Sequence, residues 1–233
     1  MPEKLRPFPA ANLSEAQLVR ALEVRSDFKN LAVILEYSLD GKTYQGLYRP
    51  QKYVRFTPDD RVPVPQELSR DVAYSQLDRQ LNWHVSLPVV PWSIKEGDQG
   101  VLRPYLPDAK TQQHYYYENQ ANLASDYYWL QVAILDYLAA VVDRNAGDIL
   151  FNQHDRHVID SGLSFVSGED FEVDRSLIRD AVKGTRIPFS LLRAVELLGE
   201  TNLESLFKET LPEEAVYWLR QRIQKTLETE TIL

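Results

Sequence analysis

The sequence has 233 residues, of which 44% are hydrophobic and 26% are charged, and its net charge is −8. This composition is typical of a globular chain with one large domain or two small lobes, and the acidic excess argues against a nucleic-acid-binding protein. The absence of cysteine excludes disulfides, thiolate nucleophiles and cysteine-ligated zinc. No apolar run approaches the roughly 20 residues that span a bilayer, and the first residues lack a signal-peptide core. We therefore expect a soluble, cytoplasmic protein without integral membrane contact.

The first half of the sequence predicts a small α+β lobe over residues 1–107. Residues 12–25 have a helix-start pattern, in which Ser14 can cap and Gln17 can reach back. Residues 30–50 predict a β-hairpin around Asp40-Gly41, a dipeptide typical of type I′ turns. A helix is predicted over 65–83, and a second antiparallel pair, 86–92 with 101–106, follows it. The predicted order is therefore α-β-β-α-β-β.

The second half, residues 108–233, predicts a mostly helical lobe. A polar, tyrosine-rich stretch joins the lobes, and its tyrosines at 114–119 are expected to pack at the junction. A long buried helix is predicted over 123–142, followed by a short hairpin over 148–160. The remaining helices are predicted at 173–183, 188–198, 202–208 and 212–229. The fold class is thus α+β with two lobes.

Three aspartates lie close together in the stretch VVDRNAGDILFNQHDRHVIDSGLSF, residues 141–165. Phosphoryl transfer needs a carboxylate that orients the attacking hydroxyl and oxygen ligands that hold Mg²⁺ on nucleotide phosphates. Asp143, Asp148 and Asp160 could supply this set, because a hairpin brings Asp148 and Asp160 to the same end. Alternatively, Asp143 ends a helix, Asp148 starts a strand and Asp160 precedes a glycine turn. The spacing alone leaves both interpretations open.

The segments DRNAGD and VIDSGLSF resemble the D-R-x-x-x-N and I-D-x-G-x-x-F motifs of the phosphatidylinositol 3-/4-kinase-like family. The similarity is greatest to its small bacterial stand-alone branch, which is related to HipA-like kinases. GLYRP, LSRDVAYSQLDRQLNW, LPVVPWSIKEGDQGVLRPYLPDA and IRDAVKGTRIPFSLLRAVELL resemble further family segments in the same order, so the resemblance covers about residues 20–225. It implies a two-lobed protein-kinase-like fold with a small antiparallel-sheet N-lobe and a mostly helical C-lobe.

The resemblance assigns roles to residues of the second lobe. Asp143 matches the catalytic aspartate, and Arg144 the adjacent arginine that positions the loop. Asp160 matches a metal-binding aspartate, and Asp148 stands where the family has a metal-binding asparagine. This substitution adds a negative charge beside the metal, which strengthens cation binding and repels nucleotide phosphates. Gly162 allows the tight backbone beside Asp160.

The resemblance also assigns nucleotide contacts to the first lobe. Arg49 replaces a phosphate-contacting lysine, and Asp71 replaces its glutamate partner. The longer arginine and the shorter aspartate are compensatory changes that can preserve the ion pair. Residues 102–106 align with the adenine-contacting hinge, which contains Arg103, Tyr105 and Leu106. Ser26 and Asp27 align with a polar turn that faces the phosphates.

These assignments imply an enzyme, a phosphotransferase that uses ATP and Mg²⁺. Basic residues between 166 and 186 are few, which favours a protein or small-molecule hydroxyl over a lipid as the acceptor. The alternative is a weakly active or inactive pseudokinase that acts as a nucleotide-binding or protein-interaction module. Glycine-rich Rossmann and P-loop motifs are absent from the sequence. His154 and His157 flank the predicted hairpin turn and are expected to be turn residues rather than metal ligands.

Overall fold

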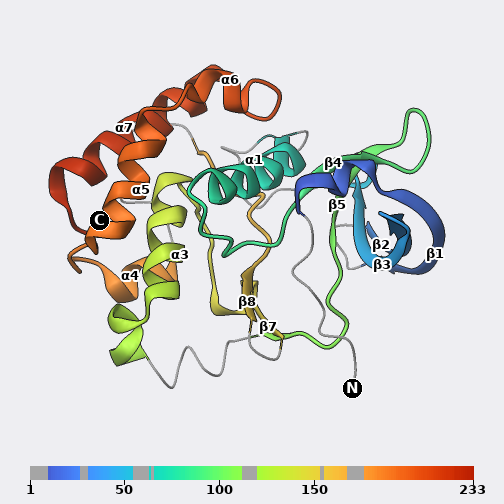
Figure 1. Cartoon of the computed structure of the whole chain (residues 1–233), viewed down its shortest axis with the longest axis horizontal. Helices are drawn as coiled ribbons and strands as arrows, with labels where there is room; N and C mark the ends of the chain where they lie inside the picture. Colours follow the sequence, from blue (N-terminus) through green and yellow to red (C-terminus); the bar gives the residue numbers. More distant parts are fainter. Residues whose placement is uncertain are drawn as a thin grey trace. The chain divides into compact units, whose positions relative to one another are not determined.

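The structure is a computed structural model that describes residues 10–26, 31–54, 63, 66–111, 120–152, 155–166 and 176–233. It divides into two compact units, which are described separately (Figure 1). Unit 1 comprises Met1–Phe56 and Pro88–Pro107, and unit 2 comprises Thr57–Leu87 and Asp108–Leu233. None of the helices within the described ranges is both long and apolar enough to cross a membrane.

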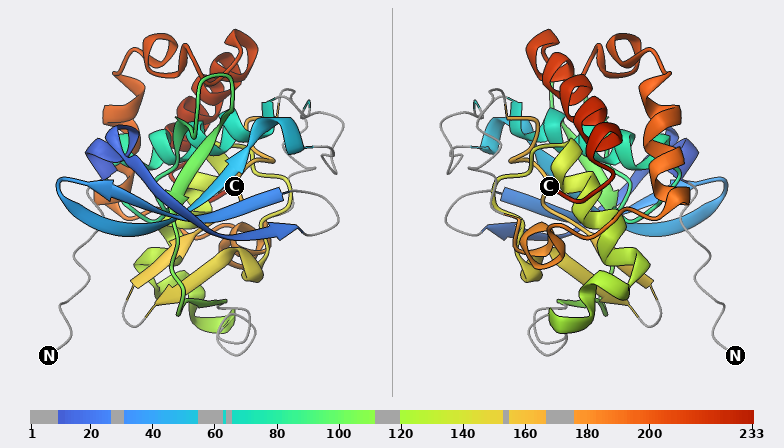
Figure 2. Two further views of the ribbon diagram at one scale, coloured as in Figure 1. Left: turned by 90° about the vertical axis from the view of Figure 1, so that its right-hand side faces the viewer. Right: turned by 90° about the vertical axis from the view of Figure 1, so that its left-hand side faces the viewer.

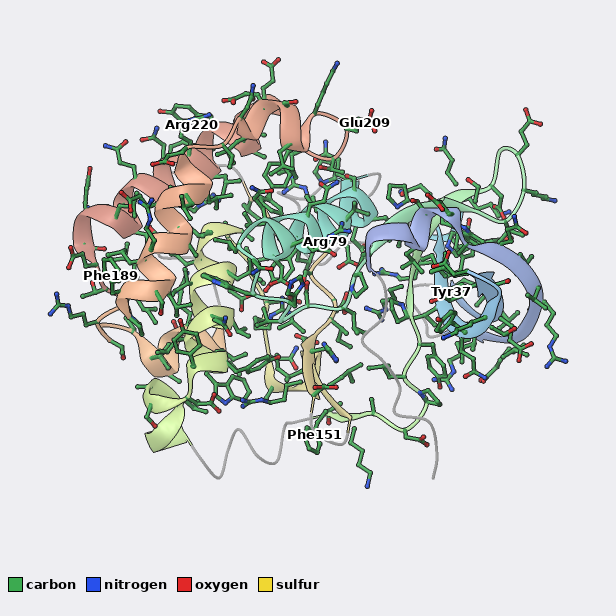
Figure 3. All side chains as sticks on the ribbon, viewed as in Figure 1. Tyr37, Arg79, Phe151, Phe189, Glu209 and Arg220 are labelled. Carbon is green, nitrogen blue, oxygen red and sulfur yellow. The ribbon has the colours of Figure 1, made fainter. Side chains whose placement is uncertain are left out.

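Unit 1 is built on a five-stranded antiparallel sheet with the strand order β1-β2-β3-β5-β4. Its strands are β1 (Gln17–Ser26), β2 (Leu31–Leu39), β3 (Lys42–Pro50), β4 (Val90–Ser93) and β5 (Gln99–Pro104). Two short 3₁₀ helices, η1 (Ala10–Glu15) and η2 (Gln51–Tyr53), flank the first three strands. The core of this unit contains Tyr37, which Figure 3 labels, and Tyr48, both fully buried.

Both hairpins predicted for this region are confirmed. Asp40 and Gly41 connect β2 to β3 with φ angles of 52° and 71°, as a type I′ turn requires. Between β4 and β5 the chain turns through Gly97, whose φ is 81°. The short β2–β3 connection thus follows from the turn dipeptide.

The predicted helix over residues 12–25 is wrong, because this segment forms η1 and the strand β1. β1 pairs with β2 from Gln17 to Ser26, and Figure 2 shows it as a long curved strand (dark blue). The pairing shifts register between Leu18 and Arg20 and again between Ala21 and Glu23. Each shift interrupts the two-residue alternation of side chains, so the apolar residues acquire a spacing that resembles a helix.

Unit 2 contains the helices α1 and α3–α7 and a small three-stranded sheet, β6-β7-β8 (Figure 1). The helices are α1 (Glu67–Gln80), α3 (Tyr127–Leu138), α4 (Leu177–Val182), α5 (Phe189–Gly199), α6 (Leu203–Phe207) and α7 (Glu213–Thr229). The strands are β6 (Lys110–Thr111), β7 (Ile149–Asn152) and β8 (Asp155–Val158), and the 3₁₀ helices are η4 (Gln120–Ser125) and η5 (Ala146–Asp148).

One large core holds unit 2 together and explains why α1 belongs to it. Ala73, Tyr74 and Leu77 of α1 share this core with most of α3 and with the buried faces of α5 and α7. α3 begins four residues later and ends four residues earlier than predicted. Its first residues form η4, and Ala140, with a φ of 45°, turns the chain out of the helix. The predicted division into lobes at residues 107 and 108 stays a prediction of domain organisation.

The hairpin predicted over 148–160 and the four C-terminal helices are present, as β7–β8 and α4–α7. His157 lies within β8, opposite Leu150, rather than at the turn. Several predicted features lie outside the described residues, namely Asp27, the tyrosines within 114–119 and His154.

Candidate functional site

The loop that carries Asp143 is held by hydrogen bonds among the residues that directly follow Arg144. Asn145 caps η5 by accepting from the amide of Gly147 at 2.8 Å. Asp148 completes a capping box, because its Oδ2 accepts from the backbone amide of Asn145 at 3.0 Å and from its Nδ2 at 2.7 Å. The sequence Asn-x-x-Asp thus fixes the backbone between the two aspartates, and the Asp143 side chain is exposed to solvent.

Arg144 is buried, and its guanidinium connects this loop to two other segments. Its Nε lies 3.2 Å from Asp136 Oδ2 on α3, and neither side chain is exposed. Its Nη2 donates to Ser161 Oγ at 2.8 Å, and its Nη1 donates to the carbonyl of Ile159 at 2.6 Å. The predicted positioning arginine therefore lies between the Asp143 loop and the segment that contains Asp160.

Asp136 is a buried residue next to the candidate site that the sequence-based assignments did not include. Besides Arg144, its carboxylate accepts from the hydroxyl of Tyr74 on α1 at 2.8 Å and from Ser176 Oγ at 2.9 Å. Burial lowers the pKa of Arg144, but its interactions with Asp136, Tyr74 and Asp148 together outweigh this effect, and the net shift is upward. The sequence did contain a signal for this residue, because Asp136 is a charged residue inside the largely apolar helix α3, and a buried carboxylate needs a partner.

Asp160 follows β8 and has a left-handed backbone, with a φ of 57°. Its side chain is exposed, whereas the next residues, from Ser161 to Val166, are buried. The amide of Ser161 donates to Asp71 Oδ1 at 3.3 Å. Asp71, a buried residue of α1, thereby orients the backbone next to Asp160.

The three predicted carboxylates interact electrostatically. Burial raises the pKa of Asp148 to about 7; Arg144 and the Asn145 amide oppose this rise, and the charges of Asp160 and Asp143 add to it. Such repulsion favours a bound cation. Within the described ranges no three His, Asp or Glu side chains converge on one ion position. Mg²⁺ on nucleotide phosphates usually takes only one or two protein carboxylates, so Asp148 and Asp160 fit that donor set.

The predicted nucleotide contacts of unit 1 lie on β3, β5 and the end of β1. Arg49 is buried and lies opposite Val101, and Arg103 lies opposite Leu47. The side chain of Ser26, the last residue of β1, is outside the described residues. Arg49 and Asp71 belong to different units, so their ion pair stays a prediction.

The segment after β5 is also anchored within unit 1. The amide of Tyr105 donates to the carbonyl of Gln45 at 3.0 Å. Arg25 Nη2 donates to the Tyr105 hydroxyl at 3.1 Å, and its guanidinium lies 5.4 Å from the centre of the tyrosine ring. Leu106 follows as a half-buried residue. β1 thus contacts the predicted hinge through the exposed side chain of Arg25.

The sequence matches no protein-family model and no curated protein. The structure is similar to that of hydra Fam20 with sugar, with a TM-score of 0.60, 13% identity and coverage of 95% of this chain and 87% of that chain. The chain has a two-lobed, protein-kinase-like fold. The Golgi casein kinase with Mn/ADP bound gives a TM-score of 0.57, 12% identity and coverage of 95% and 74%.

The fold also extends to a bacterial kinase of similar size. The Helicobacter pylori proinflammatory kinase CtkA gives a TM-score of 0.52 and 9% identity, and 93% of each chain is covered. These likenesses confirm the predicted α+β kinase-like fold. At such low identities they establish the fold alone, so the roles of individual residues rest on the geometry described above.

Proposed function

We propose that this protein is a phosphotransferase that uses ATP and Mg²⁺. The observation that carries the proposal is the electrostatic interaction of three nearby aspartates: burial raises the pKa of Asp148 to about 7, and the charges of Asp160 and Asp143 add to this rise. Carboxylates brought together at a cost in repulsion indicate a site that binds cations or protons. In a kinase-like fold, such a set matches the needs of phosphoryl transfer.

In this proposal Asp143 binds the acceptor hydroxyl and orients it. As the hydroxyl oxygen bonds to the γ-phosphorus, the bond from that phosphorus to the ADP oxygen breaks, and Asp143 accepts the hydroxyl proton. Its exposed side chain is accessible to an acceptor. Arg144 does not touch the acceptor, because its buried guanidinium is engaged by Asp136 and Ser161.

Asp148 and Asp160 would hold Mg²⁺. The bound ion supplies positive charge that neutralises the phosphates of the nucleotide. Asn145 and Arg144 lie beside the same oxygen of Asp148, its Oδ2. This arrangement orients the carboxylate that would hold the ion. The Mn/ADP bound to the Golgi casein kinase supports the use of a nucleotide and a divalent ion.

Arg49 of unit 1 is proposed to contact the phosphates, and Asp71, which belongs to unit 2, is proposed to fix Arg49 as the resemblance implies. Arg103, Tyr105 and Leu106 would contact the adenine, and Ser26 would face the phosphates. The motifs DRNAGD and VIDSGLSF support a chemistry of the phosphatidylinositol 3-/4-kinase-like type. The acceptor is proposed to be a hydroxyl of a protein or small molecule.

A pseudokinase is the second candidate, and Asp148 is the residue that favours it. An amide at this position would be neutral, whereas a carboxylate beside Asp160 and Asp143 concentrates negative charge where phosphates must bind. A module that binds nucleotide without Mg²⁺ would tolerate this charge only while Asp148 is protonated.

Thermal-shift titrations with ATP, with and without Mg²⁺, separate the two candidates. The kinase proposal expects stabilisation that depends on Mg²⁺ and that Asp160→Asn abolishes, together with transfer of the γ-phosphate to added acceptors. Asp180→Asn, which changes an exposed carboxylate of α4, serves as the matched control and should leave both results unchanged. Stabilisation without Mg²⁺ dependence would favour a nucleotide-binding pseudokinase, and no stabilisation at all would refute the kinase proposal.

A further inference from the structure

The segment from Ile159 to Val166 has an unusual backbone that its own sequence does not stabilise. It forms neither helix nor strand, although six of its residues, from Ser161 to Val166, are buried. Asp160 and Phe165 are non-glycine residues with φ angles of 57° and 53°. Each left-handed residue costs about 1–2 kcal/mol, so the surrounding structure must impose this conformation.

Three arginines from distant parts of unit 2 donate hydrogen bonds to the backbone carbonyls of this segment. Arg144 bonds Ile159 at 2.6 Å and Asp160 at 3.5 Å, Arg70 bonds Ser164 at 2.5 Å and Phe165 at 2.6 Å, and Arg222 bonds Val166 at 2.8 Å. Five of the eight carbonyls of the segment are therefore satisfied by side chains rather than by a helix or a sheet. All three arginines are at most 2% exposed.

Each of these arginines also makes a further hydrogen bond, Arg222 to another helix and Arg70 to the N-cap of its own helix. Arg222, on α7, donates to the carbonyl of Leu138 at the end of α3 at 3.1 Å. Arg70, on α1, donates to Gln66 Oε1 at 3.0 Å. A forked, desolvated guanidinium can bridge two acceptors in this way, whereas a lysine ammonium places all its donors on one nitrogen.

Two backbone hydrogen bonds also join the 159–166 segment to the chain that leads into Asp143. The amide of Val142 donates to the carbonyl of Leu163 at 3.1 Å, and the amide of Phe165 donates to the carbonyl of Ala139. A shift of the 159–166 segment would therefore displace Asp143 as well as Asp160.

We propose that Arg70 and Arg222 are positioning residues, which fix Asp160 before any ligand binds and thereby set the metal affinity of the site. This inference rests on the proposed function. Loss of either bridge leaves Asp160 free to leave its left-handed conformation, so the site must be re-ordered whenever the ion binds. Loss of residues that orient a metal ligand typically weakens metal binding 10–100-fold.

A purely structural role makes a different prediction. If the two arginines only stabilise the core, their variants should lower the melting temperature without a specific effect on Mg²⁺. We therefore compare Arg70→Lys and Arg222→Lys with Ile223→Val. This control variant removes a methyl group from the buried face of α7, the helix that carries Arg222. Arg220→Lys is a second control on α7, since Arg220 lies on the outer side of the helix (Figure 3) and pairs with Glu204 at 2.9 Å.

Two measurements on the full chain test the proposal. Hydrogen–deuterium exchange of peptides that cover 159–166 should be at least about tenfold faster in both Arg→Lys variants than in either control. In ATP-binding titrations, the Mg²⁺ concentration that gives half of the maximal increase in ATP affinity should be about 10–100-fold higher in the variants than in the wild type. The affinity for ATP without Mg²⁺ should stay within about twofold of the wild-type value.

The possible failures can be told apart. If the wild type shows no Mg²⁺-dependent ATP binding, the proposed function is wrong, and the assignment of a metal-positioning role is wrong with it. If the wild type binds Mg²⁺ and ATP but the Arg→Lys variants behave like Ile223→Val in both measurements, the inference alone is overturned. Because Arg70 and Arg222 lie on different helices, either variant gives a result if the other does not fold.

Discussion

Replacing Asp136 with asparagine should destabilise this protein strongly, because it removes the negative charge that lies 3.2 Å from the buried Arg144 Nε. The change keeps the size of the side chain. It replaces one carboxylate oxygen with an amide nitrogen, which then faces donors from Arg144 and from Tyr74 or Ser176. Removing one partner of a buried ion pair costs about 3–5 kcal/mol, since the remaining charge stays desolvated.

Urea denaturation of the wild type and of Asp136→Asn measures this loss directly. For a chain of this size, the loss corresponds to a melting temperature lowered by roughly 6–20 °C. The double variant Asp136→Leu/Arg144→Met should recover part of it, because it removes the buried charge altogether. Glu204→Gln, which breaks an exposed pair with Arg220, is the control and should have no measurable effect. If Asp136→Asn costs no more than Glu204→Gln, the reasoning from burial is refuted.

Three further predictions concern other parts of unit 2. Burial lowers the pKa of His157 in the folded state, so the free energy of unfolding should fall as the pH drops below about 6.5, by at most about 1.4 kcal/mol per pH unit. A series of urea titrations at different pH values measures this slope, and the variant His157→Gln should lack it. In Gly162→Ala the new Cβ would lie 2.5 Å from Glu67 Cγ, and this clash should lower the free energy of unfolding by about 1–3 kcal/mol in denaturant titrations. An unchanged midpoint would show that the Glu67 side chain moves aside freely. Leu219→Ala empties a fully buried position of α7 and should cost about 2–5 kcal/mol by calorimetry, and a smaller loss would mean that the core collapses around the gap.

Local sequence signals predicted the elements whose structure is determined locally. The Asp40-Gly41 dipeptide specified a hairpin because its backbone conformation is intrinsic to the two residues. The same approach failed for β1, where two register shifts disguise the strand and pairing with β2 outweighs the helical spacing. Propensity is a weak prior that tertiary contacts override.

The candidate site was predictable only in part, because some of its contacts are made between residues that lie far apart in the sequence. The aspartates at 143, 148 and 160 stand within one short stretch, so their association was visible in the sequence. Arg70 and Arg222 bind backbone carbonyls, and carbonyls are present at every position, so no motif marks their targets. Arg222 did leave one sign: it shares the helical face of the buried Leu219, Ile223 and Thr226, where an arginine needs a buried partner.

The arginine contacts to the 159–166 segment also set the order in which this site can form. Ninety-four residues separate Arg70 from Ser164, and fifty-six separate Arg222 from Val166. Contacts between such distant positions form late in folding, because the loop-closure entropy must be overcome first. During synthesis, the segment leaves the ribosome before α7 does. A nascent chain that already contains all three aspartates therefore lacks the helix that supplies the last of these contacts. We expect the 159–166 segment to become ordered only after α7 has docked.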